Sequence, residues 1–392
     1  MLPQNNIVAF PVELSRPAFN RERLKEARLE KQWTQTGLAH AIEVTPETVS
    51  NLESGDRQPG AETLAKLCDK LGYSPGYFSL PDGEGGKLDS PIFFRSFASK
   101  KKRQNHSLNV WRLRAGRILA FLAKFVNLPP VRLPKANWSA DDSAEELTER
   151  AESLAQECRR TWGIGDGPIG NLTRLLESMG VCVVRLDVPD MEDVDGFSCW
   201  QDGRPMIFII SQTSAARERL NLAHEVLHLI AHRDVAVDSV EDKTALKVRE
   251  SQAFAFGGAL LAPRSTYGRE VISFSISHFT QLKRRWGLAI AGQGKRCVSL
   301  GIMDEDRYIQ LRKNLSWGKQ LVIEPLDEST PNEAPLMMRQ AIEILSEHKV
   351  ITGWQIAEKF GLPPSKMHQF TTLPEDYFAP PSEPTPSMHL LA

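Results

Sequence analysis

Residues 220–233, LNLAHEVLHLIAHR, constrain the fold more than any other stretch of this chain. Apolar residues fill most positions between and around the histidines, which predicts a buried helix. His224 and His228 are four residues apart, so on a helix they lie one turn apart, about 6 Å along the axis and roughly 40° around it. Two imidazoles so placed can bind one tetrahedral Zn²⁺ ion. The segment therefore predicts a buried helix that presents a zinc site.

The same turn carries Glu225, on the face next to the histidines. Its carboxylate could take a proton from a water molecule whose pKa the ion lowers towards about 7, which is the role of the Glu in the H-E-x-x-H pattern. The simpler alternative is an amphipathic helix that carries two histidines and no metal. We predict the zinc site, with Glu225 as the catalytic acid and base.

A third ligand is required, and the sequence offers two candidates. Glu250 lies 22 residues beyond His228, a spacing that lets an antiparallel helix return its carboxylate to the ion. His232 lies about 12 Å along the helix from His224 and about 80° around it, which makes shared coordination awkward. We favour Glu250 and expect His232 behind the ligands or at the surface.

The N-terminal region has the rhythm of several short helices. Predicted helices span 21–31, 35–42, 46–52 and 62–71. Thr34 and Thr45 are suitable N-caps, and Gly55 and Gly72 are suitable helix ends. The start of the third helix could then approach a DNA major groove. The candidate DNA-binding residues are Gln35, Thr45, Glu47, Thr48, Asn51 and Arg57.

Charge is unevenly distributed along the chain. Residues 1–80 hold nine Lys and Arg against ten Asp and Glu, so the alternative is a helical domain used only for dimerisation. Residues 91–140 hold eleven Lys and Arg and no acidic residue, although the whole chain carries a net charge of −1. This stretch could supply phosphate neutralisation, or it could be a solvated linker face.

Beyond residue 140 the signals follow an α+β order and not repeated βαβ units. Three strand candidates lie between predicted helices, at Val181–Leu186, Gly196–Trp200 and Pro205–Ile210. We expect a mainly α, α+β fold with a short sheet and a helical C-terminal region. The expected segments are a helix-turn-helix domain at 1–80, a basic linker and helix at 81–140, a zincin-like domain at 141–326, and a helical tail with a disordered end at 327–392.

Composition favours a cytoplasmic protein. No run of about 18 apolar residues and no secretion signal is found, so we expect no membrane association. Five scattered cysteines without a C-x-x-C pair argue against disulfides or a Cys-rich zinc site. Cys199, on a strand candidate, could act as a fourth, inhibitory ligand, but we expect a buried structural thiol.

Two stretches resemble known families. The run RERLNLAHEVLHLIAH, followed by RESQAFAFGGALLAP at 249–263, resembles the ImmA/IrrE family of zinc metallopeptidases. The matching positions after the histidines are Glu250, Ala253, Phe256, Leu260, Leu261 and Pro263. The likeness extends over roughly 140–326, and Gly257 and Gly258 depart from the family's usual Ala. The segment 33–72 resembles the Cro/cI (Xre-like) family, through Thr34-Gln35, Thr45, Val49-Ser50 and Glu53-x-Gly55.

The resemblance implies His224, His228 and Glu250 as zinc ligands and Glu225 as the catalytic residue. It also implies a transcriptional regulator that binds double-stranded operator DNA, as a homodimer, and cleaves a partner repressor, an antitoxin or itself. The alternative is a non-enzymatic regulator or antitoxin in which the zinc fold only senses a ligand or docks a partner. Retention of Glu225 favours catalysis, because a purely structural zinc site does not need that carboxylate.

Overall fold

The structure is a computed structural model that describes residues 18–90, 99–138, 143–191, 194–210, 213–234, 243–317 and 323–381. It divides into two compact units, Met1–Asp82 and Gly83–Ala392, which are treated separately. The fold is α+β and mainly α, as predicted. The expected internal divisions at 140 and 326 stay predictions. None of the described helices is long and apolar enough to cross a membrane.

The first unit contains the short helices expected from the N-terminal sequence. They are α1 (Arg21–Glu30), α2 (Gln35–Ala41), α3 (Pro46–Ser54), α4 (Ala61–Leu71) and the 3-10 helix η1 (Pro75–Ser79). The hydroxyl of Thr34 accepts the N–H of Gly37 at 3.0 Å, and that of Thr45 accepts the N–H of Thr48 at 3.2 Å. Gly55 ends α3 at φ +90°, a conformation that favours glycine. The predicted caps are confirmed, and α3 runs two residues beyond the predicted end.

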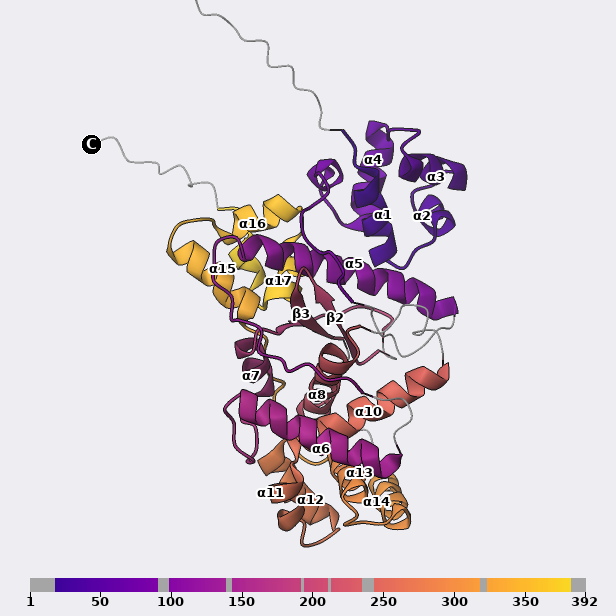
Figure 1. Cartoon of the computed structure of the whole chain (residues 1–392). Coiled ribbons are helices and arrows are strands. Elements are labelled where there is room, and N and C mark those ends of the chain that lie inside the picture. Colours follow the sequence, from indigo (N-terminus) through magenta and orange to yellow (C-terminus); the bar gives the residue numbers. More distant parts are fainter. Residues whose placement is uncertain are drawn as a thin grey trace, which may run out of the picture. The chain divides into compact units, whose positions relative to one another are not determined.

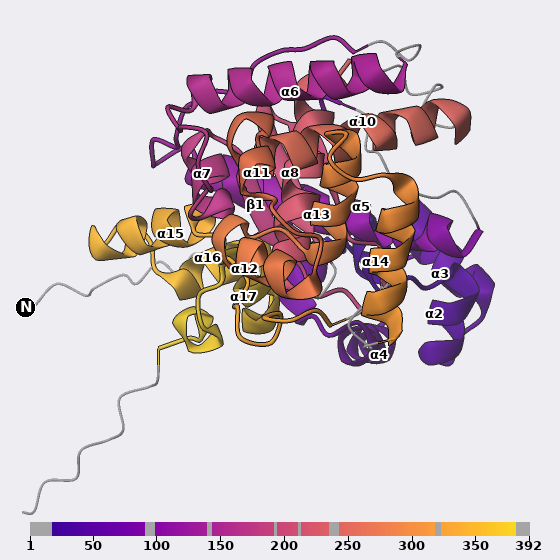
Figure 2. The same cartoon turned by 90° about the horizontal axis from the view of Figure 1, so that it is seen from below.

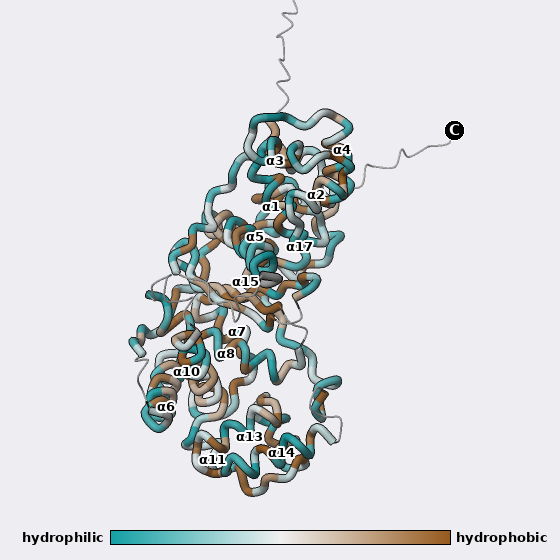
Figure 3. The backbone as a smooth tube through the Cα atoms, turned by 90° about the vertical axis from the view of Figure 1, so that its right-hand side faces the viewer, coloured by the Kyte–Doolittle hydropathy of each residue, from teal (hydrophilic) through white to brown (hydrophobic). Residues whose placement is uncertain are grey.

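A three-stranded sheet lies at the centre of the second unit. Its strands are β1 (Cys182–Arg185), β2 (Gly196–Gln201) and β3 (Arg204–Ile209). The order is β1-β3-β2, with β3 parallel to β1 and antiparallel to β2. All three lie where the sequence predicts strands. Apolar segments gather along these strands, between α5 (Ser99–Leu122) and α8 (Ala215–Ala231) (Figure 3).

Helix α5 covers one face of the sheet and α8 covers the other (Figure 1). On the α5 side, Arg112 donates to the side chain of Gln201 and, at 3.0 Å, to the carbonyl of Gly86. At Gly116 a Cβ would overlap the Gln201 amide, so a larger residue there would displace the Gln201 side chain. On the α8 side, the indole N–H of Trp200 donates to the carbonyl of Leu229 at 2.9 Å. Successive side chains of β2 point to opposite faces of the sheet, so Gln201 contacts α5 and Trp200 contacts α8.

The basic stretch at 91–140 is not a solvated face throughout. Arg112, Arg114 and Arg117 on α5 are each less than a tenth exposed, whereas Lys102 and Arg103 are exposed. Arginine is often buried along its aliphatic stem when its guanidinium finds partners. Three of the eleven cations are thus part of the second unit's interior, so the stretch offers fewer charges to phosphates than its composition indicates. Part of it lies outside the described residues.

The second unit holds further helices. They include α6 (Ala144–Thr161), α7 (Leu172–Ser178), α10 (Lys243–Leu261), α11 (Arg264–Glu270), α12 (Ile276–Trp286), α13 (Ile290–Ser299) and α14 (Glu305–Trp317). Of these, α10 and α7 contact α8 directly. Helix α6 runs alongside α10 (Figures 1 and 2). The two are joined by buried Arg159, which donates to the carbonyl of Leu260 at 2.6 and 2.9 Å. This contact helps to hold α10 in place against α8.

The C-terminal tail is helical, as predicted, and packs on the rest of the second unit. Its helices are α15 (Met337–Glu347), α16 (Gly353–Phe360), α17 (Pro364–Thr371) and the 3-10 helix η2 (Glu375–Phe378). The ring of Phe370 lies 5.4 Å from that of Trp111 on α5. The predicted disordered end lies outside the described residues.

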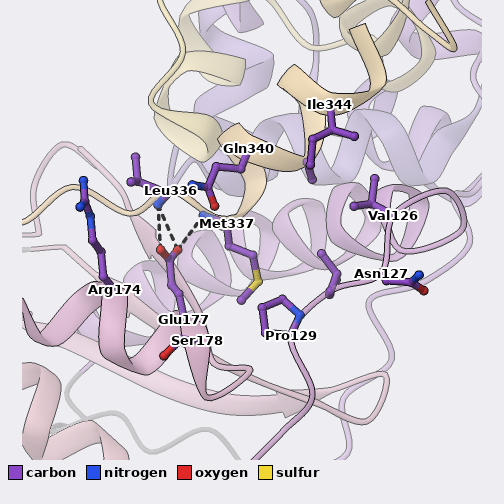
Figure 4. A pocket seen from close by; sticks show the side chains of 12 residues that line it. Val126, Asn127, Pro129, Arg174, Glu177, Ser178, Leu336, Met337, Gln340 and Ile344 are labelled. Atoms are coloured by element: carbon purple, nitrogen blue, oxygen red, sulfur yellow. Dashed lines mark hydrogen bonds between the residues drawn. The ribbon is translucent and has the colours of Figure 1, made fainter. Parts of the chain in front are cut away.

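Glu177 on α7 holds the start of the tail. Its carboxylate accepts the backbone N–H groups of Leu336 and Met337, at 2.9 to 3.1 Å, in the way that a capping side chain satisfies a helix N-terminus. Beside it lies a cavity of about 490 Å³ that Arg174, Gln340 and Ile344 also line (Figure 4). The tail is thus attached to the sheet-containing part of the chain through a buried ionisable group.

Candidate functional site

Helix α8 brings His224 and His228 together in the buried arrangement that the spacing predicts. Their Nε2 atoms are 3.1 Å apart, and the two side chains are 1% and 4% exposed. Neighbouring ligands of a tetrahedral zinc ion are separated by roughly 3.3 to 3.4 Å when the bonds are about 2.0 to 2.1 Å long. The spacing of the two nitrogens is close to that requirement.

Glu250 reaches the same point from α10. Its Oε2 lies 3.5 Å from Nε2 of His224, and its Oε1 lies 3.5 Å from Nε2 of His228. Burial alone would raise the pKa of Glu250, but the two imidazoles outweigh it and hold the pKa well below its usual value. Two imidazoles and a carboxylate are a donor set that zinc accepts in catalytic sites. The residues present therefore fit the ion.

A second carboxylate lies beside this group. An oxygen of Glu225 also lies within 4.8 Å of a ligand atom of each histidine. Glu225 therefore lies next to the two imidazoles, where a carboxylate could exchange a proton with a bound substrate.

Ser198 on β2 positions Glu225. Its hydroxyl donates to Oε2 of Glu225 at 2.7 Å and lies 3.3 Å from the Glu225 carbonyl, and Ser198 itself is 2% exposed. We did not identify this residue from the sequence. Because side chains alternate along a strand, the sequence could only have indicated that Ser198 and Trp200 share a face.

The other face of β2 carries Cys199, next to Ser198 in sequence. It is buried, and burial raises the pKa of its thiol to about 12. Since successive side chains of a strand point to opposite faces, Cys199 faces away from the side on which Ser198 contacts α8. It behaves as the structural thiol that we expected.

The space between α8 and α10 depends on a glycine. A Cβ added at Gly257 would lie 3.2 Å from the backbone nitrogen of His224, tighter than an ordinary contact, whereas one at Gly258 would meet only the side chain of Arg296 at 3.4 Å. The departure from Ala at Gly257 thus has a packing role. A Cβ there would require α8 and α10 to separate by a few tenths of an ångström.

His232 lies outside the group formed by His224, His228 and Glu250. Its Nδ1 lies 2.8 Å from Nδ1 of His228, and its Nε2 lies 3.0 Å from Oε1 of Gln252 on α10. Burial lowers the pKa of His232 to about 3. This agrees with the expectation that His232 lies behind the ligands. Gln252 is a second residue that we did not identify from the sequence.

One edge of the site is reached by solvent. Phe254 on α10 is 43% exposed, and its ring lies edge-to-face against His224 at 4.4 Å between centroids. The side chain of Glu250 is 19% exposed. A closed structural zinc site would not need this opening, whereas a catalytic site does.

In the first unit, four candidate DNA-binding residues lie at the start of α3 or along its first two turns. They are Thr45, Glu47, Thr48 and Asn51. Thr45 and Glu47 are exposed, and Thr48 and Asn51 are half-buried. The hydroxyls of Thr45 and Thr48 lie 3.0 Å apart. The structure therefore brings these candidates together on one helix end.

The other two candidates have different surroundings. Arg57 is exposed in the loop after α3, and its backbone N–H donates to the Asn51 carbonyl at 3.1 Å. The side-chain amide of Gln35 donates to Glu53 at 2.9 Å. Glu53 also accepts two hydrogen bonds from Arg28, at 2.6 and 2.7 Å. Gln35 thus helps to tie α2 to α3 and α1.

Two family models match parts of the chain. Residues 24–78 match the family model described as Helix-turn-helix, and residues 176–290 match the one described as IrrE N-terminal-like domain. The second match is narrower than the resemblance over 140–326 that the sequence indicates, and it includes both histidines and Glu250. No curated protein matches the chain. The chain is therefore a fusion of a DNA-binding helix-turn-helix domain with an IrrE N-terminal-like domain of a metallopeptidase family.

Proposed function

We propose that this protein is a transcriptional regulator whose second unit is a zinc-dependent endopeptidase that cleaves a partner repressor, an antitoxin or the chain itself. One observation carries the proposal. Two imidazole nitrogens and a carboxylate converge to within 3.5 Å of one another, and a further carboxylate, oriented by Ser198, lies beside them. A site that serves structure alone has no use for that second carboxylate.

In this proposal His224, His228 and Glu250 hold the ion. Zinc, when bound, polarises the scissile carbonyl and lowers the pKa of a water molecule. Glu225 accepts the proton of the attacking water and then delivers it to the leaving amine. The hydroxyl of Ser198 limits the rotation of the Glu225 carboxylate, so that it stays oriented during both transfers.

The peptidase assignment is tested by comparing the wild type with Glu225→Gln. Each zinc-loaded protein is incubated alone and with candidate repressors of the helix-turn-helix type, and cleavage is followed by mass spectrometry. Loss of the base should lower the cleavage rate by roughly 10² to 10⁴-fold with the zinc content unchanged. Glu343→Gln, on α15, is the matched control for loss of a carboxylate. Equal rates in wild type and Glu225→Gln would remove the peptidase and leave a non-enzymatic regulator.

The first unit is proposed to bind an operator through α3, as a homodimer on a pseudo-palindrome. The capped helix start with exposed Thr45 and Glu47 supports this, and Glu47 could accept from a cytosine amine. Binding of the full chain to its own upstream DNA, measured by fluorescence anisotropy at several salt concentrations, tests the proposal. Affinity should fall as salt rises. Indifference to the DNA sequence and to salt would refute operator binding and favour a protein-docking domain.

A further inference from the structure

Behind the ligand His228, three buried side chains form a chain of hydrogen bonds. Gln252 on α10 contacts His232, and His232 contacts His228. We infer that Gln252 is a positioning residue: through His232 it sets the tautomer of His228 that leaves the Nε2 lone pair available to a metal ion. This inference rests on the proposed zinc site.

The direction of the chain follows from which atoms can donate. Oε1 of Gln252 only accepts, so Nε2 of His232, 3.0 Å away, carries the proton. A neutral imidazole has one N–H, which leaves Nδ1 of His232 as an acceptor. Nδ1 of His228, 2.8 Å from it, must then be the donor. Neutral His228 therefore has no proton on Nε2, the atom that lies 3.1 Å from Nε2 of His224 and 3.5 Å from Glu250.

Because the three side chains are buried, both hydrogen bonds between them have to be made. Gln252, His232 and His228 are 3%, 3% and 4% exposed, so water cannot readily replace one of the three groups, and a hydrogen bond left unmade at this depth is unfavourable. The reversed order would begin with the Gln252 amide N–H as donor and would end with a proton on Nε2 of His228. That tautomer cannot coordinate a metal through Nε2.

The residue types fit the inference. Ligand histidines usually donate their second ring N–H to a carboxylate or carbonyl, and this contact fixes the tautomer. Here the imidazole of His232 receives the N–H of His228. Because an imidazole can be either donor or acceptor, the group that fixes the tautomer must be the next one in the hydrogen-bond chain. The acceptor oxygen of Gln252 occupies that place, two positions after Glu250 on the same helix. Helix α10 therefore supplies both a metal ligand and the group that prepares another.

The test uses the full-length protein and reads the tautomers without metal. Nitrogen-15 NMR of labelled histidines in the metal-free protein should show His228 protonated on Nδ1 and His232 on Nε2. Gln252→Met, which keeps the volume but removes the acceptor, should abolish this preference. Zinc affinity, measured by competition with a chelator, should fall by roughly 10 to 100-fold. Gln252→Glu, which restores an acceptor, should recover both properties.

A matched control separates the tautomer from general loss of stability. Gln293 is fully buried on α13 and donates to the carbonyls of Phe279 and Leu288, so Gln293→Met removes buried hydrogen bonds without touching the three residues. It should leave the His228 tautomer unchanged.

Two results would overturn the inference. One is a proton on Nε2 of His228 in the metal-free wild type. The other is a wild-type tautomer or a wild-type zinc affinity in Gln252→Met. A wild type with the expected tautomers and no affinity for zinc would instead remove the proposed peptidase and leave the tautomer chain standing.

Discussion

Glu177 makes the stability of the second unit depend on pH. Burial raises the pKa of this carboxyl to about 6, against the opposing effects of the N–H groups of Met337 and Leu336 and the charge of Arg174. The ordinary value is 4.5. A carboxyl whose pKa is raised in the folded state binds its proton more tightly there than in the unfolded chain. Its contribution to stability is therefore present below about pH 4.5 and is lost as the pH rises through about 6.

The magnitude follows from the shift. The pKa of Glu177 in the folded protein is about 1.5 units above its ordinary value. This shift corresponds to a change of about 2 kcal/mol in the free energy of unfolding between low and high pH. Replacing the carboxyl by an amide removes the ionisation but keeps an oxygen that can accept from Met337. Relative to Glu177→Gln, the wild type should thus lose about 2 kcal/mol of unfolding free energy between pH 4.5 and 7.5.

Urea denaturation of both proteins at a series of pH values measures this difference. Because the chain has two units, their transitions must be resolved before a free energy is assigned to either. Glu343→Gln on α15, whose carboxylate pairs with Arg339 at the surface, controls for loss of a negative charge. The reasoning is refuted if the wild type gains stability relative to Glu177→Gln as the pH rises, since the N–H donors would then outweigh burial.

Four further substitutions should have local effects. Ser198→Ala removes a hydrogen bond to the Glu225 carboxylate, and a hydrogen bond to a charged group contributes about 1.5 to 3 kcal/mol. Cleavage should therefore slow by roughly 10 to 100-fold at unchanged zinc content. An unaltered rate would show that Ser198 does not position Glu225. Gly258→Ala should raise the free energy of unfolding by up to about 1 kcal/mol, because alanine has the higher helix propensity. Gly257→Ala should weaken zinc binding, because its Cβ meets the backbone of His224. Equal zinc affinities in the two variants would contradict this role of Gly257. Arg57→Ala should reduce the slope of log affinity for DNA against log salt by about 1, and an unchanged slope would exclude a phosphate contact.

Local spacing and capping were sufficient for much of the fold. The four-residue spacing of His224 and His228 predicts their shared face, because the geometry of one helical turn does not depend on the rest of the chain. Thr34, Thr45 and Gly55 mark helix ends for the same reason, since a cap needs only its immediate neighbours. The three strands could be placed from short apolar runs.

Tertiary packing decided what these elements contact. Ser198 and Gln252 are ordinary polar residues in the sequence, and they become parts of the site only because β2 and α10 pack on α8. The arginines of α5 suggest a cationic surface by composition, yet three of them, Arg112, Arg114 and Arg117, are buried in the second unit. Contacts between segments far apart in the chain depend on how the faces of whole helices and strands fit together, and a local pattern does not encode that fit.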